Sequence, residues 1–315
     1  MKVRKPSRIK SIFNSKDEAV KRKWKRTRQA FLFILPALII AILFVYYPAL
    51  YTLRLSFFKW DLISPEQKFV GLDNYKEILA SGSEFWKSIL ITLQYGIVYT
   101  VSSLFWGILL AVALNRNKFL NNFLQSLFFI PSVTSISVVS VVWSLIFNPQ
   151  IGPLNKFLEN LGMASTSLPQ WLNDPKLAIF VLAIIGTWQS LGYITLLFLA
   201  GLRNIPTSYY EAAAVDGANR WHSFWQITMP LLSPVLFFVV FMLIINSFQV
   251  FGAVSIMTQG RPLGSTNVVL YYIYQQGFRF FDAGVASAAS WILFMIIFIA
   301  FWFQTKFGER RVFYK

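Results

Sequence analysis

The chain has 315 residues, of which 56% are apolar and only 13% are charged. Soluble domains carry about 25% charged residues, so the composition excludes an ordinary soluble protein. The sequence contains no cysteine, which excludes disulfides, thiolate chemistry and cysteine-based metal sites.

Six windows contain no Asp, Glu, Lys, Arg or His, and each is 21 to 27 residues long. A helix needs about 20 mainly apolar residues to cross a membrane. The sequence therefore predicts an all-α membrane protein with six transmembrane helices. In chain order the windows are Ala30–Leu53, Ile89–Leu114, Phe123–Phe147, Leu177–Leu202, Leu231–Met257 and Gly284–Gln304.

The net charge of +16 is unevenly distributed, and this distribution predicts the orientation. If residues 1–29 and 306–315 are cytoplasmic tails, twenty Lys and Arg lie inside and eight outside, as the positive-inside rule requires. The basic cluster Lys21–Arg26 suits anionic headgroups beside a membrane. We therefore expect both termini in the cytoplasm and a membrane-lipid partner, with no nucleic acid.

Residues 30–305 are predicted to form one membrane domain. Pro36 and Pro48 predict bends in the first span. Residues 69–79 predict a turn and a short surface helix on the outer side. The remaining outer loops are 148–176 and 258–283, and the short 115–122 loop joins spans two and three as a hairpin.

The chain shows no energy source of its own. It contains no G-x-x-x-x-G-K-[ST] phosphate-binding loop, and all thirteen acids lie outside the six windows. Proton-driven carriers usually place such acids inside the membrane. Sodium coupling can use backbone carbonyls, so it is disfavoured rather than excluded. His222 alone makes no metal cluster. We predict a chain that is not an enzyme, holds no metal or cofactor and draws its energy from another protein.

The longest internal cytoplasmic segment is 203–230. Pro206 suits the first position of a short helix, and Gly217 suits the left-handed residue that ends one. Trp221 and the aromatics after it predict an amphipathic return to the membrane, where Pro230 opens the fifth span. An ordinary interfacial loop with anchoring aromatics is the alternative.

One motif in this segment is specific. Glu211-Ala212-Ala213, then three residues, Gly217, then nine residues, and Ile227-Thr228-Met229-Pro230 resembles the EAA motif of permeases from ATP-binding-cassette (ABC) importers. Met229 stands where Leu is common. From about residue 30 onward the chain is similar to the maltose and glycerol-phosphate permeases, although Arg261 replaces a glycine of their outer loop.

This resemblance implies a type I importer permease, of the MetI-like fold, in a bacterial plasma (inner) membrane. It implies a sugar or oligosaccharide as cargo, delivered by an external binding protein. The implied partners are a second permease subunit and two ATPase subunits that hydrolyse the ATP. The residues expected to couple to the ATPase are Glu211, Ala212, Ala213, Asp216, Gly217, Ile227 and Pro230.

Substrate contacts are expected in spans four and five, where amide, hydroxyl and aromatic side chains interrupt the apolar sequence. Polar glue between helices is the alternative for the same side chains. The windows hold no Lys or Arg, which weighs against a phosphorylated cargo; glycerol phosphate, a polyol and a self-contained secondary transporter remain alternatives. The candidates are Trp188, Gln189, Tyr193, Asn246, Ser247 and Gln249.

Overall fold

The computed structural model describes residues 8–115 and 119–308, so residues 1–7 and 309–315 of the two predicted tails and residues 116–118 of the 115–122 loop lie outside the described residues. The chain divides into two units, Met1–Leu55 and Ser56–Lys315. Five helices are long and apolar enough to cross a membrane, and a bent pair supplies a sixth crossing if it counts as one span. The predicted all-α membrane fold is confirmed.

The first unit is one helical run with a single irregular turn. It comprises α1 (Arg8–Ala41), a wide π turn η1 (Ile42–Tyr46) and α2 (Tyr47–Leu55). The wide turn ends at Tyr46, two positions before Pro48, whose ring would collide with the carbonyl four residues earlier in a regular helix. Pro36 lies inside regular α1, so only one of the two prolines coincides with a wide turn.

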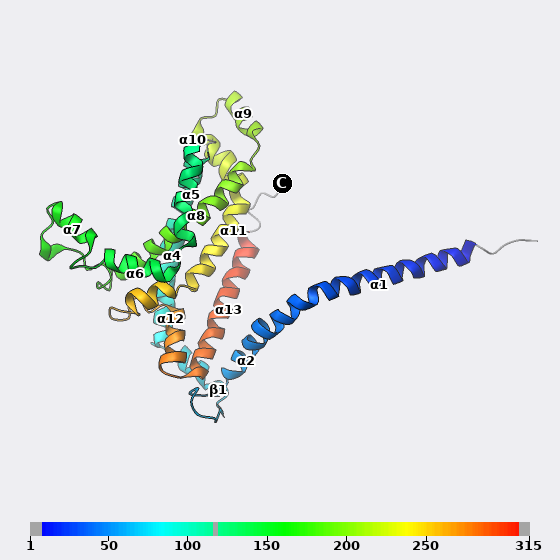
Figure 1. The fold of residues 1–315 in the computed structure, drawn as a ribbon, viewed down its shortest axis with the longest axis horizontal. Helices are drawn as coiled ribbons and strands as arrows, with labels where there is room; N and C mark the ends of the chain where they lie inside the picture. Colours follow the sequence, from blue (N-terminus) through cyan, green and yellow to red (C-terminus); the bar gives the residue numbers. More distant parts are fainter. Residues whose placement is uncertain (1–7, 116–118, 309–315) are drawn as a thin grey trace, which may run out of the picture. The chain divides into compact units, whose positions relative to one another are not determined.

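The second unit is a bundle built on four long helices, α4 (Glu84–Leu114), α8 (Ala178–Arg203), α11 (Met229–Phe248) and α13 (Ala283–Gly308) (Figure 1). Helix α4 packs against both α8 and α11, and α13 packs against α11. The main core lies between α4, α8 and α11 and includes Ala111, Leu182, Phe198 and Leu232, each fully buried.

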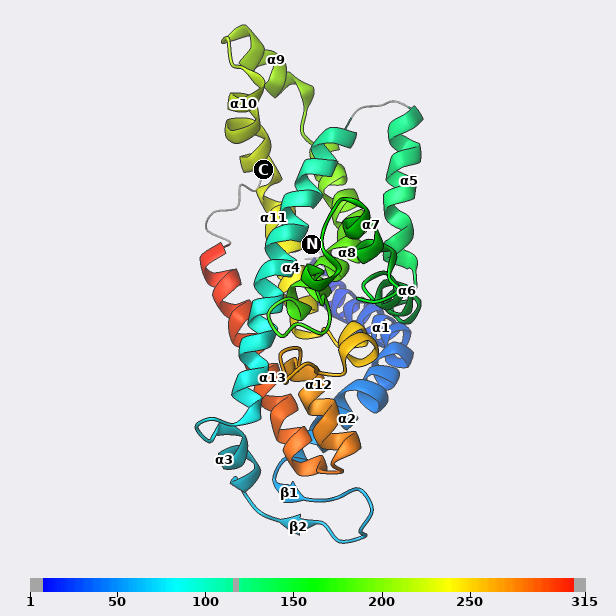
Figure 2. The same cartoon turned by 90° about the vertical axis from the view of Figure 1, so that its left-hand side faces the viewer.

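Shorter elements lie at the two ends and one side of the bundle (Figure 2). Helix α9 marks one end, called here the α9 end, and the β1–β2 hairpin marks the opposite end. The remaining elements are β1 (Phe58–Lys59), β2 (Lys68–Phe69), α3 (Asp73–Leu79), α5 (Phe119–Val133), α6 (Ile136–Ile146), α7 (Pro153–Asn160), η2 (Ser165–Ser167), α9 (Thr207–Val215), α10 (Arg220–Ser223), η3 (Phe224–Thr228), η4 (Val254–Thr258), α12 (Val269–Tyr274) and η5 (Gln275–Arg279).

The predicted surface helix is α3, and a two-stranded hairpin that the sequence did not predict precedes it. Strands β1 and β2 are antiparallel, with Phe58 opposite Phe69. The buried Asn74 of α3 donates from Nδ2 to the carbonyls of Ser56 (2.8 Å) and Phe58 (3.0 Å). One amide therefore ties the hairpin to α3.

The third apolar window is not one straight helix. Its two halves, α5 and α6, are bent by 97° at a short break. Helix α8 holds the break in place, because the Ser132 hydroxyl donates to the Gln189 carbonyl (2.9 Å) and the Gln189 amide donates to the Thr134 carbonyl (3.1 Å). Without water, backbone groups freed by a break need such partners.

In the fifth window, too, the helix ends earlier than predicted. Helix α11 ends at Phe248, and the remaining residues of the window form an irregular stretch followed by η4. The residues on both sides of Phe248 are uncharged and mainly apolar, so charge content could not reveal where the helix ends.

Gly192 permits the close approach of α5 to α8. A Cβ at this position would overlap the Phe128 carbonyl and come within 2.6 Å of the Phe129 Cα. We expect Gly192→Ala to destabilise the protein by about 1–3 kcal/mol through overpacking. Thermal unfolding of the purified chain in detergent measures this. Ala200→Val, at an exposed position of the same helix, is the matched control; equal unfolding temperatures for both variants would contradict the prediction.

Candidate functional site

The predicted cytoplasmic helix is α9, and its end has the predicted geometry. The helix spans Thr207–Val215, with Pro206 one position before it rather than at its first residue. Gly217 has φ +80°. The Ala218 N–H donates to the Ala213 carbonyl (2.9 Å) and the Gly217 N–H to the Ala214 carbonyl (3.1 Å). These two bonds form a Schellman cap, in which a glycine supplies the left-handed turn.

Helix α9 is fixed to the following segment by one hydroxyl pair. The Tyr210 hydroxyl and the Thr228 Oγ1 lie 2.9 Å apart. Asn219 caps the next helix by accepting the His222 N–H (2.8 Å). Residues 211–217 and 227–230, the two parts of the motif, are therefore held at a defined distance from each other.

The motif residues converge on one hollow of about 480 Å³ at the α9 end. Glu211, Ala212, Asp216 and Gly217 are exposed, while Ala213, Ile227 and Pro230 are half-buried. Four of these seven residues line the hollow, together with four neighbours: Ala213, Asp216, Gly217 and Ile227, with Ala218, Asn219, His222 and Gln226. The first and last parts of the motif thus form one continuous, open surface.

Pro230 is the second residue of α11, as the sequence predicts for the start of the fifth span, but the helical run extends back beyond it. The helical run is continuous from Arg220 to Phe248, and Pro230 lies inside it. The wide turn η3 ends at Thr228, two positions before Pro230, and the Met229 N–H is bonded to the Phe224 carbonyl. A wide turn accommodates a proline that has no N–H to donate, so the helical run through α10, η3 and α11 begins at Arg220, ten residues before Pro230.

A second site is a cavity of about 400 Å³ among α4, α5, α8 and α11. Four of the six predicted substrate residues line it: Gln189, Tyr193, Asn246 and Gln249. None of the described residues that line it is charged. The others are Tyr95, Tyr99, Ser132, Ile136, Gly186, Ser190, Val250, Phe251, Gly252 and Ala253.

Trp188 and Ser247 lie outside this cavity. The Trp188 ring packs against Trp143, with 5.4 Å between centroids. Ser247 is buried beside Gly96, and its hydroxyl donates to the Ile244 carbonyl (2.7 Å). Both residues directly neighbour a lining residue, and successive residues of a helix point about 100° apart.

Helix α4 also contributes to this cavity, which was not predicted from the sequence. Tyr95 and Tyr99 stack on each other with centroids 5.6 Å apart and line one wall. Their spacing of four residues places them on the same helix face. Two tyrosines at this spacing inside a charge-free window were the signal that could have identified them.

Gln189 fits both the substrate interpretation and the polar-glue alternative. Its amide nitrogen is committed to the Thr134 carbonyl, while the side chain also borders the cavity. We expect Gln189→Leu to speed amide hydrogen exchange at residues 133–136, because the carbonyl at the break loses its partner. Hydrogen–deuterium exchange of the purified chain measures this.

Gln249→Leu is the control, since Gln249 lines the same cavity without an assigned side-chain bond to the break. The glue role would be refuted by unchanged exchange at residues 133–136 in Gln189→Leu.

The fold and these two sites define a helical membrane permease. The chain belongs to the family described as the binding-protein-dependent transport system inner membrane component, whose match covers residues 103–312. The predicted class, an ABC importer permease, is confirmed. This family is that of permease subunits, and its description places the protein in an inner membrane.

Curated relatives match over most of their length. The probable ABC transporter permease protein YesP of Bacillus subtilis is 36% identical over 84% of this chain and 85% of its own. The trehalose/maltose permease MalF of Thermococcus litoralis is 32% identical, covering 88% and 92%. The sn-glycerol-3-phosphate permease UgpA of Agrobacterium fabrum is 31% identical, covering 90% and 96%.

A solved structure supports the fold independently. One chain of a bacterial ABC transporter that imports the acidic polysaccharide alginate has a TM-score of 0.79 to this chain, with 22% identity. The match covers 93% of this chain and 99% of that one. At this identity the likeness concerns the fold alone.

Proposed function

We propose that this subunit carries an uncharged sugar or oligosaccharide across the membrane. The observation that supports this cargo is the cavity of about 400 Å³, lined by hydroxyl, amide and aromatic side chains. Hydroxyls and amides can exchange hydrogen bonds with sugar hydroxyls, and aromatic rings suit the apolar faces of a sugar ring. A charged solute would lack a compensating charge among these lining residues.

Glycerol phosphate is the second candidate, because one relative is named a permease for it. A phosphate dianion in a low-dielectric site needs an Arg, a Lys or several N–H donors. The described lining of this cavity offers no basic side chain, which favours the neutral cargo. A partner subunit is the remaining source of such a charge.

The energy for transport is proposed to enter at α9. The small side chains Ala212 and Ala213 and the exposed Glu211 would let an ATPase subunit approach closely and form a charged hydrogen bond. This role places α9 and both termini in the cytoplasm. The working complex would contain a second permease subunit, two ATPase subunits that hydrolyse ATP and an external binding protein; this chain itself would hydrolyse nothing.

The experiment that tests this function is co-purification of the tagged chain from its host, followed by ATP hydrolysis assays with a panel of solutes and binding proteins. We expect an ATPase subunit to co-elute and neutral sugars to stimulate hydrolysis. Stimulation by glycerol phosphate alone would overturn the neutral cargo. Transport by the chain alone in liposomes without ATP would overturn the importer assignment.

The cap of α9 provides a test of coupling. Gly217→Pro replaces a residue at φ +80° with one restricted to about −65°, so the cap cannot form. We expect loss of ATP-driven uptake with normal membrane insertion. Gly162→Pro is the matched control, because Gly162 ends α7 at φ +96° with the same pair of cap bonds. Coupling through α9 is refuted if Gly217→Pro retains uptake, or if both variants lose it equally.

The cavity provides a test of the substrate path. Asn246→Leu removes an amide from the lining, and losing one hydrogen bond to a sugar should reduce uptake about 5- to 10-fold. Ser247→Ala, next to it but outside the cavity, should leave uptake unchanged. Initial uptake rates at equal membrane expression give the comparison. If Ser247→Ala reduced uptake more than Asn246→Leu, this cavity would not be the substrate path.

A further inference from the structure

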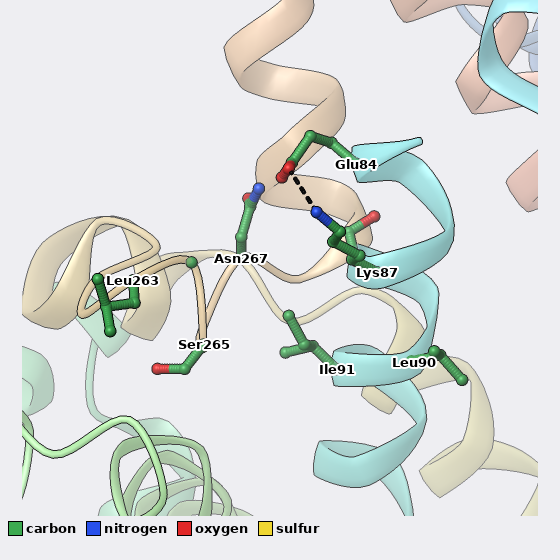
Figure 3. A pocket seen from close by; sticks show the side chains of 9 residues that line it. Glu84, Lys87, Leu90, Ile91, Leu263, Ser265 and Asn267 are labelled. Atoms are coloured by element: carbon green, nitrogen blue, oxygen red, sulfur yellow. Dashed lines mark hydrogen bonds and ion pairs between the residues drawn. The ribbon is translucent and has the colours of Figure 1, made fainter. Parts of the chain in front are cut away.

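Among the described residues, four buried polar atoms have neither a hydrogen-bond partner nor accessible surface. They are Ser103 Oγ, Ser265 Oγ, Asn267 Oδ1 and the Tyr271 hydroxyl. Ser265 and Asn267 line a groove of about 320 Å³ between the first turns of α4 and the loop before α12 (Figure 3), but these two oxygens are closed off from it. A ligand therefore cannot reach any of the four atoms.

The hydroxyl of Tyr95 also lacks a partner, but it is accessible. Tyr95 is only 5% exposed, and no hydrogen bond joins its hydroxyl to the described part of the chain. The oxygen is not one of the closed-off atoms, and the side chain lines the uncharged cavity of about 400 Å³. A buried hydroxyl without a partner is unfavourable and calls for an explanation. Here a solute inside the cavity can supply the missing hydrogen bond.

Gly186 of α8 leaves this hydroxyl free. A Cβ at position 186 would overlap the Tyr95 hydroxyl oxygen and lie 3.5 Å from the Tyr95 Cζ. The Gly186 carbonyl already accepts a hydrogen bond from the Ser190 hydroxyl (3.0 Å). The stacked Tyr99, in contrast, has the side chains of Ser190 and Asn246 beside its hydroxyl. Tyr95 therefore faces a residue that offers no side chain to pair with.

Two neighbouring donors of the cavity are committed to backbone carbonyls. The Ser132 hydroxyl donates to the Gln189 carbonyl (2.9 Å), and the Gln189 amide donates to the Thr134 carbonyl (3.1 Å). These bonds hold the break between α5 and α6. Tyr95 lies on α4 and has no such bond, so its O–H is available as a donor and its oxygen as an acceptor.

We propose that Tyr95 is a specificity-determining residue whose hydroxyl donates a hydrogen bond to one hydroxyl of the cargo. This inference rests on the proposed function, the transport of an uncharged sugar. A site built to pair with a substrate hydroxyl rejects the analogue that lacks it, because the buried group of the site is then left unpaired. The transporter is therefore selective for sugars that carry a hydroxyl at the position facing Tyr95, against the matching deoxy sugars.

The test is uptake by the complete transporter in proteoliposomes, with its binding protein present. The probe is the sugar that most stimulates ATP hydrolysis in a panel of neutral sugars including glucose, xylose, maltose and trehalose, together with its monodeoxy analogues. Tyr95→Phe removes the oxygen and keeps the ring. We expect it to reduce uptake of the parent sugar about tenfold and uptake of one analogue less than about twofold. The binding protein's own preference is the same for both variants and cancels in this comparison.

Tyr271→Phe is the matched control, because it removes an unpartnered hydroxyl that no cargo can reach. It should leave uptake of every sugar unchanged. An equal loss for the parent sugar and all its analogues in Tyr95→Phe would indicate a structural role and overturn the inference, as would no loss at all. If no neutral sugar stimulates hydrolysis by the native transporter, the proposed function itself fails.

The contact with Gly186 can be tested without any cargo. Gly186→Ala should lower the unfolding temperature of the purified chain in detergent, because its Cβ overlaps the Tyr95 oxygen. Adding Tyr95→Phe should restore most of the loss, since the Cζ at 3.5 Å is at an ordinary contact distance. If Tyr95→Phe fails to rescue Gly186→Ala, the hydroxyl does not face Gly186 and the proposal is overturned.

Discussion

The structure depends on one constraint, that backbone groups inside a membrane must be paired within the protein. A continuous helix is the usual way to pair these groups, and the 97° break between α5 and α6 departs from it. Helix α8 compensates for it with the Gln189 amide and the Gln189 carbonyl, and Gly192 lets the two backbones approach. The same contact forms a wall of the uncharged cavity, since Ser132 and Gln189 also line it. The contacts that pair the backbone at the break therefore also shape the cavity.

Most of the fold follows from the distribution of charge, and the exceptions have physical causes. The six charge-free windows correspond to five continuous helices and one bent pair, because excluding charge is what the membrane demands of any crossing segment. A break inside such a window leaves composition unchanged, so neither the α5–α6 bend nor the end of α11 was predictable from it. The glycine at position 217 was predictable, because few residues besides glycine adopt a left-handed backbone readily.

The lining of the cavity was predicted less completely than the α9 segment, because the sequence did not show which face of each helix points into the cavity. Gln189 and Tyr193 are four residues apart, and Asn246 and Gln249 three, so each pair shares a face. Trp188 and Ser247 are one residue away from these pairs and point elsewhere. A helix that is apolar nearly all round gives no amphipathic pattern by which to fix its orientation. Residue type therefore identified the chemistry of the site, whereas only the structure identified the facing side chains.

Long helices and one short turn connect the two sites. Helix α8 runs from the cavity at Gln189 to Arg203, and α9 begins at Thr207 after a three-residue turn. From the other side of the motif, a continuous helical run leads from Arg220 to Asn246 at the cavity. Because both helices end beside α9 and both line the cavity, a displacement of α9 would reach the lining through rigid elements. The connections contain two irregular elements, the turn at residues 204–206 between α8 and α9 and the wide turn η3 before Pro230, so any bending between the two sites would concentrate there.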